Sequence, residues 1–176
     1  MTFPVIYLLH GKGGSPSGSV LQLEHELRPM LPAVEFLRPL LPHSNSQLPA
    51  EDSVEILRKM NPPHGSLMIG ISLGGLVAAK LQEDGRDDLA VISISSPTWA
   101  DGVALQLRPS HRTAFYSSRD DVIADRVADW PRLADAYDLP WLTHDTDLHK
   151  LRLARLIAAR ATGRDLDRVV QDFKSC

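Results

Sequence analysis

The sequence predicts an α/β protein in which a mostly parallel, doubly wound sheet of about six strands lies between two layers of helices. Short runs rich in Val, Ile and Leu alternate along the chain with amphipathic segments. Several of these runs are apolar throughout, as expected of strands that are covered on both faces. Alternating strands and helices form parallel sheets with right-handed crossovers. We therefore expect a three-layer α/β/α sandwich.

The expected strands are the apolar runs Val5–Leu9, Val34–Leu41, Leu67–Ile71, Ala90–Ile94, Thr113–Tyr116 and Leu139–Thr143. Helices are expected between them, where apolar residues recur at helical spacing. One such helix follows Ile71 and covers Leu73–Gln82. A later one carries Val122, Arg126, Val127, Trp130 and Leu133, and a last short helix carries Leu166, Val169, Val170 and Phe173.

Composition limits the classes of protein that fit this chain. Its 176 residues suit one domain over residues 1–176, with 43% hydrophobic and 23% charged residues. A net charge of −3 without a basic stripe argues against a nucleic-acid partner. The only cysteine is Cys176, which excludes an internal disulfide and a thiolate zinc cluster. The apolar runs are too short to span a membrane, and Met1–Pro4 does not resemble a signal peptide, so we expect a cytoplasmic protein.

A glycine-rich stretch, Leu8–Gly18, directly follows the first expected strand. Glycines in such a turn let backbone N–H groups approach an anion closely. The stretch does not fit the known phosphate loops: Lys12 precedes the second glycine, unlike the lysine of G-x-x-x-x-G-K-[ST], and Pro16 stands where G-x-G-x-x-G needs its last glycine. The sequence therefore argues against a nucleotide phosphate at this turn.

The second motif is G-x-S-x-G at Gly70–Gly74, between a strand-like and a helix-like segment. This is the setting of a nucleophile elbow, in which the serine sits on a sharp strand-to-helix turn. The flanking glycines lack the Cβ atoms that would clash there, and Gly74 allows strand and helix to pack closely. Ser72 is the predicted nucleophile, although a serine in this position can also serve as a simple helix N-cap.

A serine nucleophile needs a base, and the base needs an orienting acid. Asp120 and Asp121 follow one expected strand and are the candidates for the acid. His144 and His149 follow the last expected strand and are the candidates for the base.

At these residues the chain resembles the α/β-hydrolase family. The resemblance rests on H-G-x-G-G at His10–Gly14, G-x-S-x-G at Gly70–Gly74, and an acid and a histidine in the order Ser, Asp, His. It implies Asp120 as the acid, because Val122 and Ile123 follow it as in the family, and it favours His149, where the family's loop turns into the last helix. It also implies that His10 braces the glycine-rich loop.

The resemblance further implies an oxyanion hole made by the backbone N–H groups of Lys12 (or Gly13) and Leu73. The chain looks like a minimal member without a cap domain, since Ser96–Arg112 is too short to form a lid. Trp99 is a weak candidate for a substrate contact, with packing as the simpler role.

We expect a serine hydrolase that cleaves a small-molecule ester or thioester through an acyl-enzyme, with no cofactor and no metal. The alternatives are an acyltransferase that uses the same triad, and a catalytically idle binding module with this fold. The sequence leaves the acyl group and the oligomeric state open.

Overall fold

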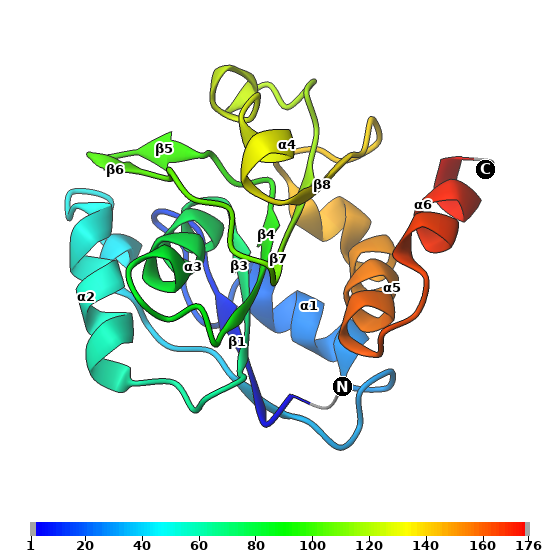
Figure 1. The fold of residues 1–176 in the computed structure, drawn as a ribbon, viewed down its shortest axis with the longest axis horizontal. Helices are drawn as coiled ribbons and strands as arrows, with labels where there is room; N and C mark the ends of the chain where they lie inside the picture. Colours follow the sequence, from blue (N-terminus) through cyan, green and yellow to red (C-terminus); the bar gives the residue numbers. More distant parts are fainter. Residues whose placement is uncertain (1–2, 175–176) are drawn as a thin grey trace.

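The computed structural model describes residues 3–174, and its centre is a six-stranded parallel sheet (Figure 1). The strand order is β2-β1-β3-β4-β7-β8. The strands are β1 (Val5–Leu9), β2 (Glu35–Leu37), β3 (Leu67–Ile71), β4 (Ala90–Ile94), β7 (Arg112–Tyr116) and β8 (Asp135–Asp138). The chain places β2 on one side of β1 and all later strands on the other side, beginning with β3. The carboxyl ends of β1 and β3 therefore flank the switch point at which open sheets of this kind bind ligands.

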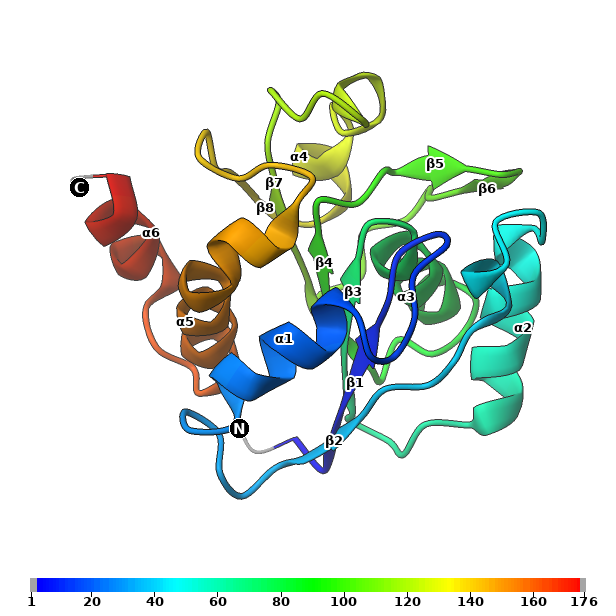
Figure 2. The ribbon, with the colours of Figure 1, turned by 180° about the vertical axis from the view of Figure 1, so that it is seen from behind.

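Helices cover both faces of the sheet, which confirms the three-layer α/β class. On one face lie α1 (Ser19–Leu27), α5 (Lys150–Ala161) and α6 (Leu166–Lys174), which are seen in front in Figure 2. On the other lie α2 (Ala50–Met60), α3 (Leu73–Glu83) and α4 (Trp130–Leu133). Residues 3–174 also form three short 3₁₀ helices, η1 (Pro42–Ser44), η2 (Ala124–Arg126) and η3 (Thr146–His149). Among the described residues no helix is long and apolar enough to cross a membrane.

The strand β1 shows why the central strands are apolar throughout. Val5, Tyr7 and Leu9 pack into the core on the α2–α3 face, whereas Ile6 and Leu8 pack into the core on the α1–α5 face. Every residue of the strand is buried. A strand with two covered faces has no solvent-exposed position, and the alternation typical of a half-exposed strand disappears.

The last strand lies earlier in the chain than predicted. We expected it over Leu139–Thr143, but β8 is the polar segment Asp135–Asp138, which pairs with β7 alone. An edge strand is partly solvated and needs no apolar run. Leu139 and Leu142 are buried beside α5, but Pro140 between them has no N–H to donate to a ladder, and the segment forms a turn.

The helix expected around Val122–Leu133 is also divided. The structure has η2, then an irregular link, then the short α4. Pro131 accounts for the break, because its ring has no N–H and clashes with a preceding turn, so it fits only the first turn of a helix. The expected strand over Val34–Leu41 is likewise shorter, since only Glu35–Leu37 pairs with β1.

The segment that joins β4 to β7 carries a small hairpin of β5 (Trp99–Ala100) and β6 (Val103–Ala104). Its two turn residues, Asp101 and Gly102, have φ angles of 49° and 82°, as a tight two-residue hairpin turn requires. The hairpin projects beyond the carboxyl end of β4 (Figure 1). It is far smaller than a cap domain, as expected for a link of this length.

Candidate active site

Ser72 lies on a strained turn between β3 and α3. It has φ 52° and ψ −123°, a conformation that costs a residue with a side chain about 1–3 kcal/mol. The Ser72 N–H donates to the Ile94 carbonyl at 2.9 Å, and the Ser72 carbonyl accepts from the Gly75 N–H at 3.0 Å. The backbone is therefore fixed on both sides, and the side chain is held at the carboxyl edge of the sheet.

The glycines around Ser72 are required by close backbone approach. A Cβ on Gly70 would lie 2.3 Å from Gly74 backbone atoms, within the turn itself. A Cβ on Gly74 would lie 2.4 Å from the Leu9 carbonyl oxygen, and one on Gly75 would lie 2.0 Å from Ser96 Oγ. Gly74 thus brings the turn against the end of β1, where the glycine-rich loop begins. We expected Gly74 to allow β3 and α3 to pack closely, but the nearest neighbours of a Cβ at this position belong to the end of β1.

Ser72, His144 and Asp120 form a chain of side-chain hydrogen bonds. Ser72 Oγ lies 3.1 Å from His144 Nε2, and His144 Nδ1 lies 3.0 Å from Asp120 Oδ2. An ionised carboxylate can only accept, so the imidazole carries its proton on Nδ1 and Nε2 is free to accept from the Ser72 hydroxyl. The arrangement can take a proton from Ser72 and hold the resulting imidazolium beside a carboxylate.

The Asp120 carboxylate is fixed by the backbone that follows it. Its Oδ1 accepts from the N–H groups of Val122 at 2.9 Å and Ile123 at 3.2 Å, which leaves Oδ2 for His144. The Asp120 side chain is 1% exposed, whereas Asp121 is exposed to solvent. The geometry therefore brings the predicted acid, Asp120, to the site and not the alternative Asp121.

The prediction of His149 as the histidine partner of Ser72 is wrong for this geometry. His149 Nε2 lies 3.1 Å from Thr143 Oγ1, and its ring packs on Trp141 with centroids 5.4 Å apart. Burial and the nearby Arg152 cation lower its pKa. His144, the alternative, lies beside Ser72 instead, and the carbonyl of the preceding residue, Thr143, accepts from Ser95 Oγ at 3.2 Å.

A local signal in the sequence bears on the choice between the two histidines. The Asp145 side chain accepts from the Asp147 N–H at the start of η3. Such a cap marks the point where the loop ends and helical structure begins. His144 precedes the cap and belongs to the loop, whereas His149 lies at the end of η3, where α5 starts.

The glycine-rich loop lies directly against Ser72. A Cβ on Gly11 would lie 3.2 Å from Ser72 Cβ. The Gly13 N–H donates to the His43 carbonyl at 2.8 Å and is therefore already used. Within residues 3–174, neither the Lys12 N–H nor the Leu73 N–H donates a hydrogen bond to another described group. Of the expected donors to an oxyanion, Lys12 and Leu73 are thus the ones whose N–H groups are available.

Two buried imidazoles hold this loop. His10 Nδ1 lies 2.9 Å from the Gly11 carbonyl, and His10 Nε2 accepts from the Leu41 N–H at 3.1 Å. His43 Nε2 lies 2.8 Å from the His10 carbonyl, and His43 Nδ1 lies 2.7 Å from Ser53 Oγ. Each ring donates once and accepts once, as a neutral imidazole does. His10 thus makes the bracing contacts expected of it, and the supporting role of His43 was missed.

Burial lowers the pKa of both imidazoles, that of His43 to about 4. Both rings are therefore neutral at pH 7, as their hydrogen bonds require. This keeps positive charge away from the loop interior.

Two cavities open beside Ser72 and His144. The first, of about 340 Å³, is lined largely by the glycine-rich loop, with Ile71, Asp145 and Thr146. The second, of about 320 Å³, lies towards the hairpin and is lined by Leu73, Pro97, Ala100, Val122 and Ile123 together with charged side chains. Trp99, 48% exposed, lines neither cavity but stacks on Arg126, which lines the second. Among the described residues no group of three or more His, Cys, Asp or Glu is placed to hold a metal ion.

The fold is that of the α/β hydrolases, as the comparison with solved structures shows. The ydeN gene product from B. subtilis superposes with a TM-score of 0.69 at 16% identity, over 89% of this chain and 98% of that chain. Alpha/beta hydrolase domain-containing protein 10 from mouse gives 0.67 at 12% identity, over 88% and 89%. An alpha-beta serine hydrolase homologue from Coxiella burnetii gives 0.65 at 14%, over 90% and 85%. No protein-family model and no curated protein sequence matches the chain.

Proposed function

We propose that the protein is a serine hydrolase that cleaves a carboxylic ester or thioester. The observation that carries this proposal is the hydrogen-bonded chain from Ser72 through His144 to Asp120, set at a strained strand-to-helix turn. A serine that only caps a helix needs neither a positive φ nor an imidazole on its hydroxyl. The likeness in fold to proteins named as hydrolases adds support.

In the proposed reaction His144 Nε2 takes the proton of Ser72 as Oγ attacks the acyl carbon. Asp120 keeps the imidazole in the required tautomer and stabilises its charged form. The carbonyl oxygen becomes an oxyanion, which accepts from the N–H groups of Lys12 and Leu73. His144 then returns the proton to the leaving alcohol or thiol, and an acyl-enzyme remains.

Water completes the cycle. His144 Nε2 takes a proton from a water molecule as the water oxygen attacks the acyl carbon. As the second tetrahedral intermediate collapses, His144 gives this proton to Ser72 Oγ, and the acid is released. Loss of one backbone donor to an oxyanion costs roughly 10²–10³ in rate. Gly11 and Gly74 let the glycine-rich loop and the turn at Ser72 approach each other closely. This close approach positions the two backbone donors, so it affects the rate of ester hydrolysis.

The test is labelling with a fluorophosphonate, followed by intact-mass measurement and peptide mapping. We expect one adduct, on Ser72, lost in Ser72→Ala and slowed by roughly 10³-fold or more in His144→Ala. His149→Ala is the matched control and should label at close to the wild-type rate. Labelling that depends on His149 rather than His144, or a folded protein that takes no label, would contradict the proposal.

A further inference from the structure

The second cavity carries a charge that the proposed chemistry does not use. Its lining includes three ionised side chains, those of Lys12, Asp101 and Arg126, next to Ser72 and His144. Lys12 and Asp101 form an ion pair with 2.7 Å between Nζ and Oδ2. Their charges cancel, and the charge that remains in this cavity is the Arg126 guanidinium.

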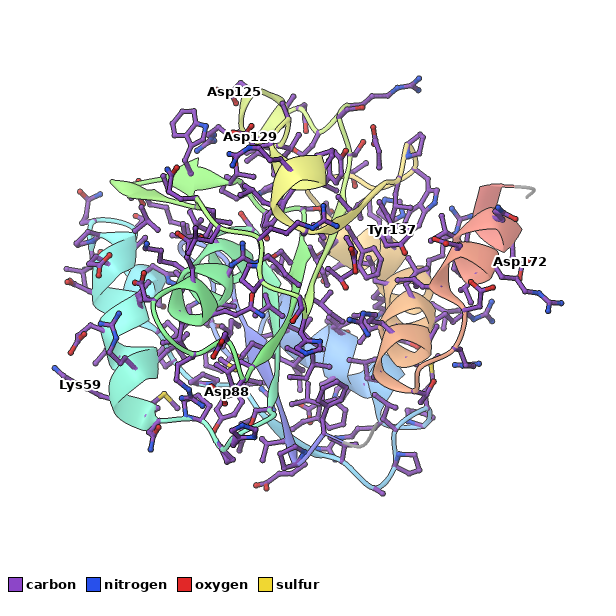
Figure 3. The ribbon with its side chains drawn as sticks, viewed as in Figure 1. Lys59, Asp88, Asp125, Asp129, Tyr137 and Asp172 are labelled. Carbon is purple, nitrogen blue, oxygen red and sulfur yellow. The ribbon has the colours of Figure 1, made fainter. Side chains whose placement is uncertain are left out.

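The contacts of Arg126 leave most of its donors available. Within the described chain, its Nε lies 3.5 Å from the carboxylate of Asp125 and its Nη2 donates to the Val122 carbonyl at 3.3 Å. The Asp125 side chain is 74% exposed and lies at the outer edge of the molecule (Figure 3). An exposed pair of adjacent residues contributes little, and a guanidinium has five N–H donors.

The side chain is nevertheless held in place. Its guanidinium carbon lies 5.6 Å from the centroid of the Trp99 ring, at the distance of a cation–π contact. The Arg126 carbonyl accepts from both the N–H and the Oγ1 of Thr98, at 2.7 and 2.9 Å. Arg126 thus contacts Thr98 through its main chain and Trp99, the first residue of β5, through its side chain, which is only 27% exposed.

The cavity that Ser72 and Arg126 both line also has apolar lining residues. These are Leu73, Pro97, Ala100, Val122 and Ile123. A volume of about 320 Å³ equals that of roughly ten liquid water molecules, which is room for a short methylene chain and a terminal group. A cavity with apolar lining residues and a guanidinium suits a chain that ends in an anion.

We propose, on the basis of the serine hydrolase function above, that the preferred substrate is an ester or thioester with an anionic group such as a carboxylate. A short apolar spacer separates this group from the reacting carbonyl, and the anion binds Arg126. The cavity borders both the nucleophile and the base, so the anion is carried on either the acyl or the alcohol side of the ester.

The experiment compares anionic esters with their neutral methyl esters. On the acyl side the pair is para-nitrophenyl hydrogen adipate and para-nitrophenyl methyl adipate. On the alcohol side it is ω-acetoxyhexanoate and its methyl ester. We expect the anionic member of one pair to be preferred by about 10- to 100-fold in kcat/KM, the range of a charge-assisted hydrogen bond. The pair that shows the preference indicates whether the substrate carries its anion on the acyl side or on the alcohol side of the ester.

Arg126→Gln should remove this preference, so that in the variant kcat/KM for the anionic ester falls to the value for its neutral methyl ester measured in the same variant. The loss should fall mainly on KM, because the anion contacts Arg126 before and during the reaction alike. Arg132→Gln is the matched control: this arginine of α4 is exposed, pairs with Asp129, and does not line the cavity. It should behave as the wild type.

The two proposals fail in different ways. Equal kcat/KM for the anionic and neutral members of both pairs, with no change in Arg126→Gln, overturns the role of Arg126 while hydrolysis itself stands. A preference that persists in Arg126→Gln also overturns it. Absence of hydrolysis of every ester, together with absence of fluorophosphonate labelling of Ser72, overturns the proposed function.

Discussion

The Lys12 ammonium lies 2.7 Å from the Asp101 carboxylate, and this contact joins the glycine-rich loop to the turn of the β5–β6 hairpin. The two residues are 89 positions apart in the chain. Together they form one border of the second cavity, beside Ser72. Both side chains remain partly open to solvent, 41% for Lys12 and 30% for Asp101.

Asp101→Asn should lower the free energy of unfolding by less than about 1 kcal/mol, because the pair is partly exposed. Asn tolerates the positive φ of this turn as well as Asp does, so the substitution isolates the charge. Chemical denaturation with urea at low and at high salt measures the effect. The difference from the wild type should shrink at high salt, and a difference that salt leaves unchanged would show that the turn, not the ion pair, is affected.

Asp120→Asn and Asp121→Asn form a matched pair one residue apart. In Asp120→Asn the new amide keeps an oxygen for the N–H groups of Val122 and Ile123 but no longer fixes the required tautomer of His144. We expect kcat for ester hydrolysis to fall by roughly 10³- to 10⁴-fold in this variant. Asp121→Asn should stay within about twofold of the wild type, because this side chain is solvent-exposed. Equal losses in both variants would argue against the assigned acid.

Gly74→Ala should destabilise the protein by about 2–3 kcal/mol or more, because its Cβ would lie 2.4 Å from Leu9 O and 2.5 Å from His10 O. Relief requires the end of β1 to move away from Ser72, so labelling of Ser72 by the fluorophosphonate should slow as well. Thermal unfolding and labelling rates of Gly74→Ala and of the wild type measure the effect, and wild-type behaviour of the variant would refute the close approach.

Acid should destabilise the fold through His43. Burial lowers the pKa of His43 to about 4, whereas an unfolded histidine titrates near 6.5. As pH falls from about 6.5 towards 4, the unfolded chain binds a proton that the folded protein does not. The free energy of unfolding is therefore highest above pH 6.5 and falls by up to about 3 kcal/mol as pH decreases from about 6.5 to about 4. The lowered pKa of His10 adds a loss of the same sign.

An NMR titration of the imidazole resonances provides the direct measurement for His43. The ring should remain neutral down to about pH 4, and a midpoint near 6.5 would contradict the prediction. Urea denaturation at pH 7 and pH 5 should show the matching loss of stability. In His43→Gln, where folded protein is obtained, the loss over this range should be smaller.

Much of the fold was predictable because the central strands are buried on both faces. The apolar runs at Val5–Leu9, Leu67–Ile71 and Ala90–Ile94 coincide with β1, β3 and β4. The edge strand β8 was missed because it is partly solvated and can therefore be polar. The strand was predicted instead at the buried apolar residues Leu139 and Leu142, which follow it. Burial and strand pairing are separate properties, and hydrophobicity reports only burial.

The sequence by itself determined the α/β class and the place of Ser72 on a strand-to-helix turn, because the local chain dictates both. Gly70 is needed by the turn itself, because a Cβ there would meet the Gly74 backbone, whereas Gly74 is needed because the turn lies against the end of β1. Tertiary structure decided between His144 and His149, since both follow the same strand and only the folded chain brings the His144 ring to both Ser72 and Asp120. It also placed Arg126 beside the site, because its position depends on packing against the hairpin rather than on any local pattern.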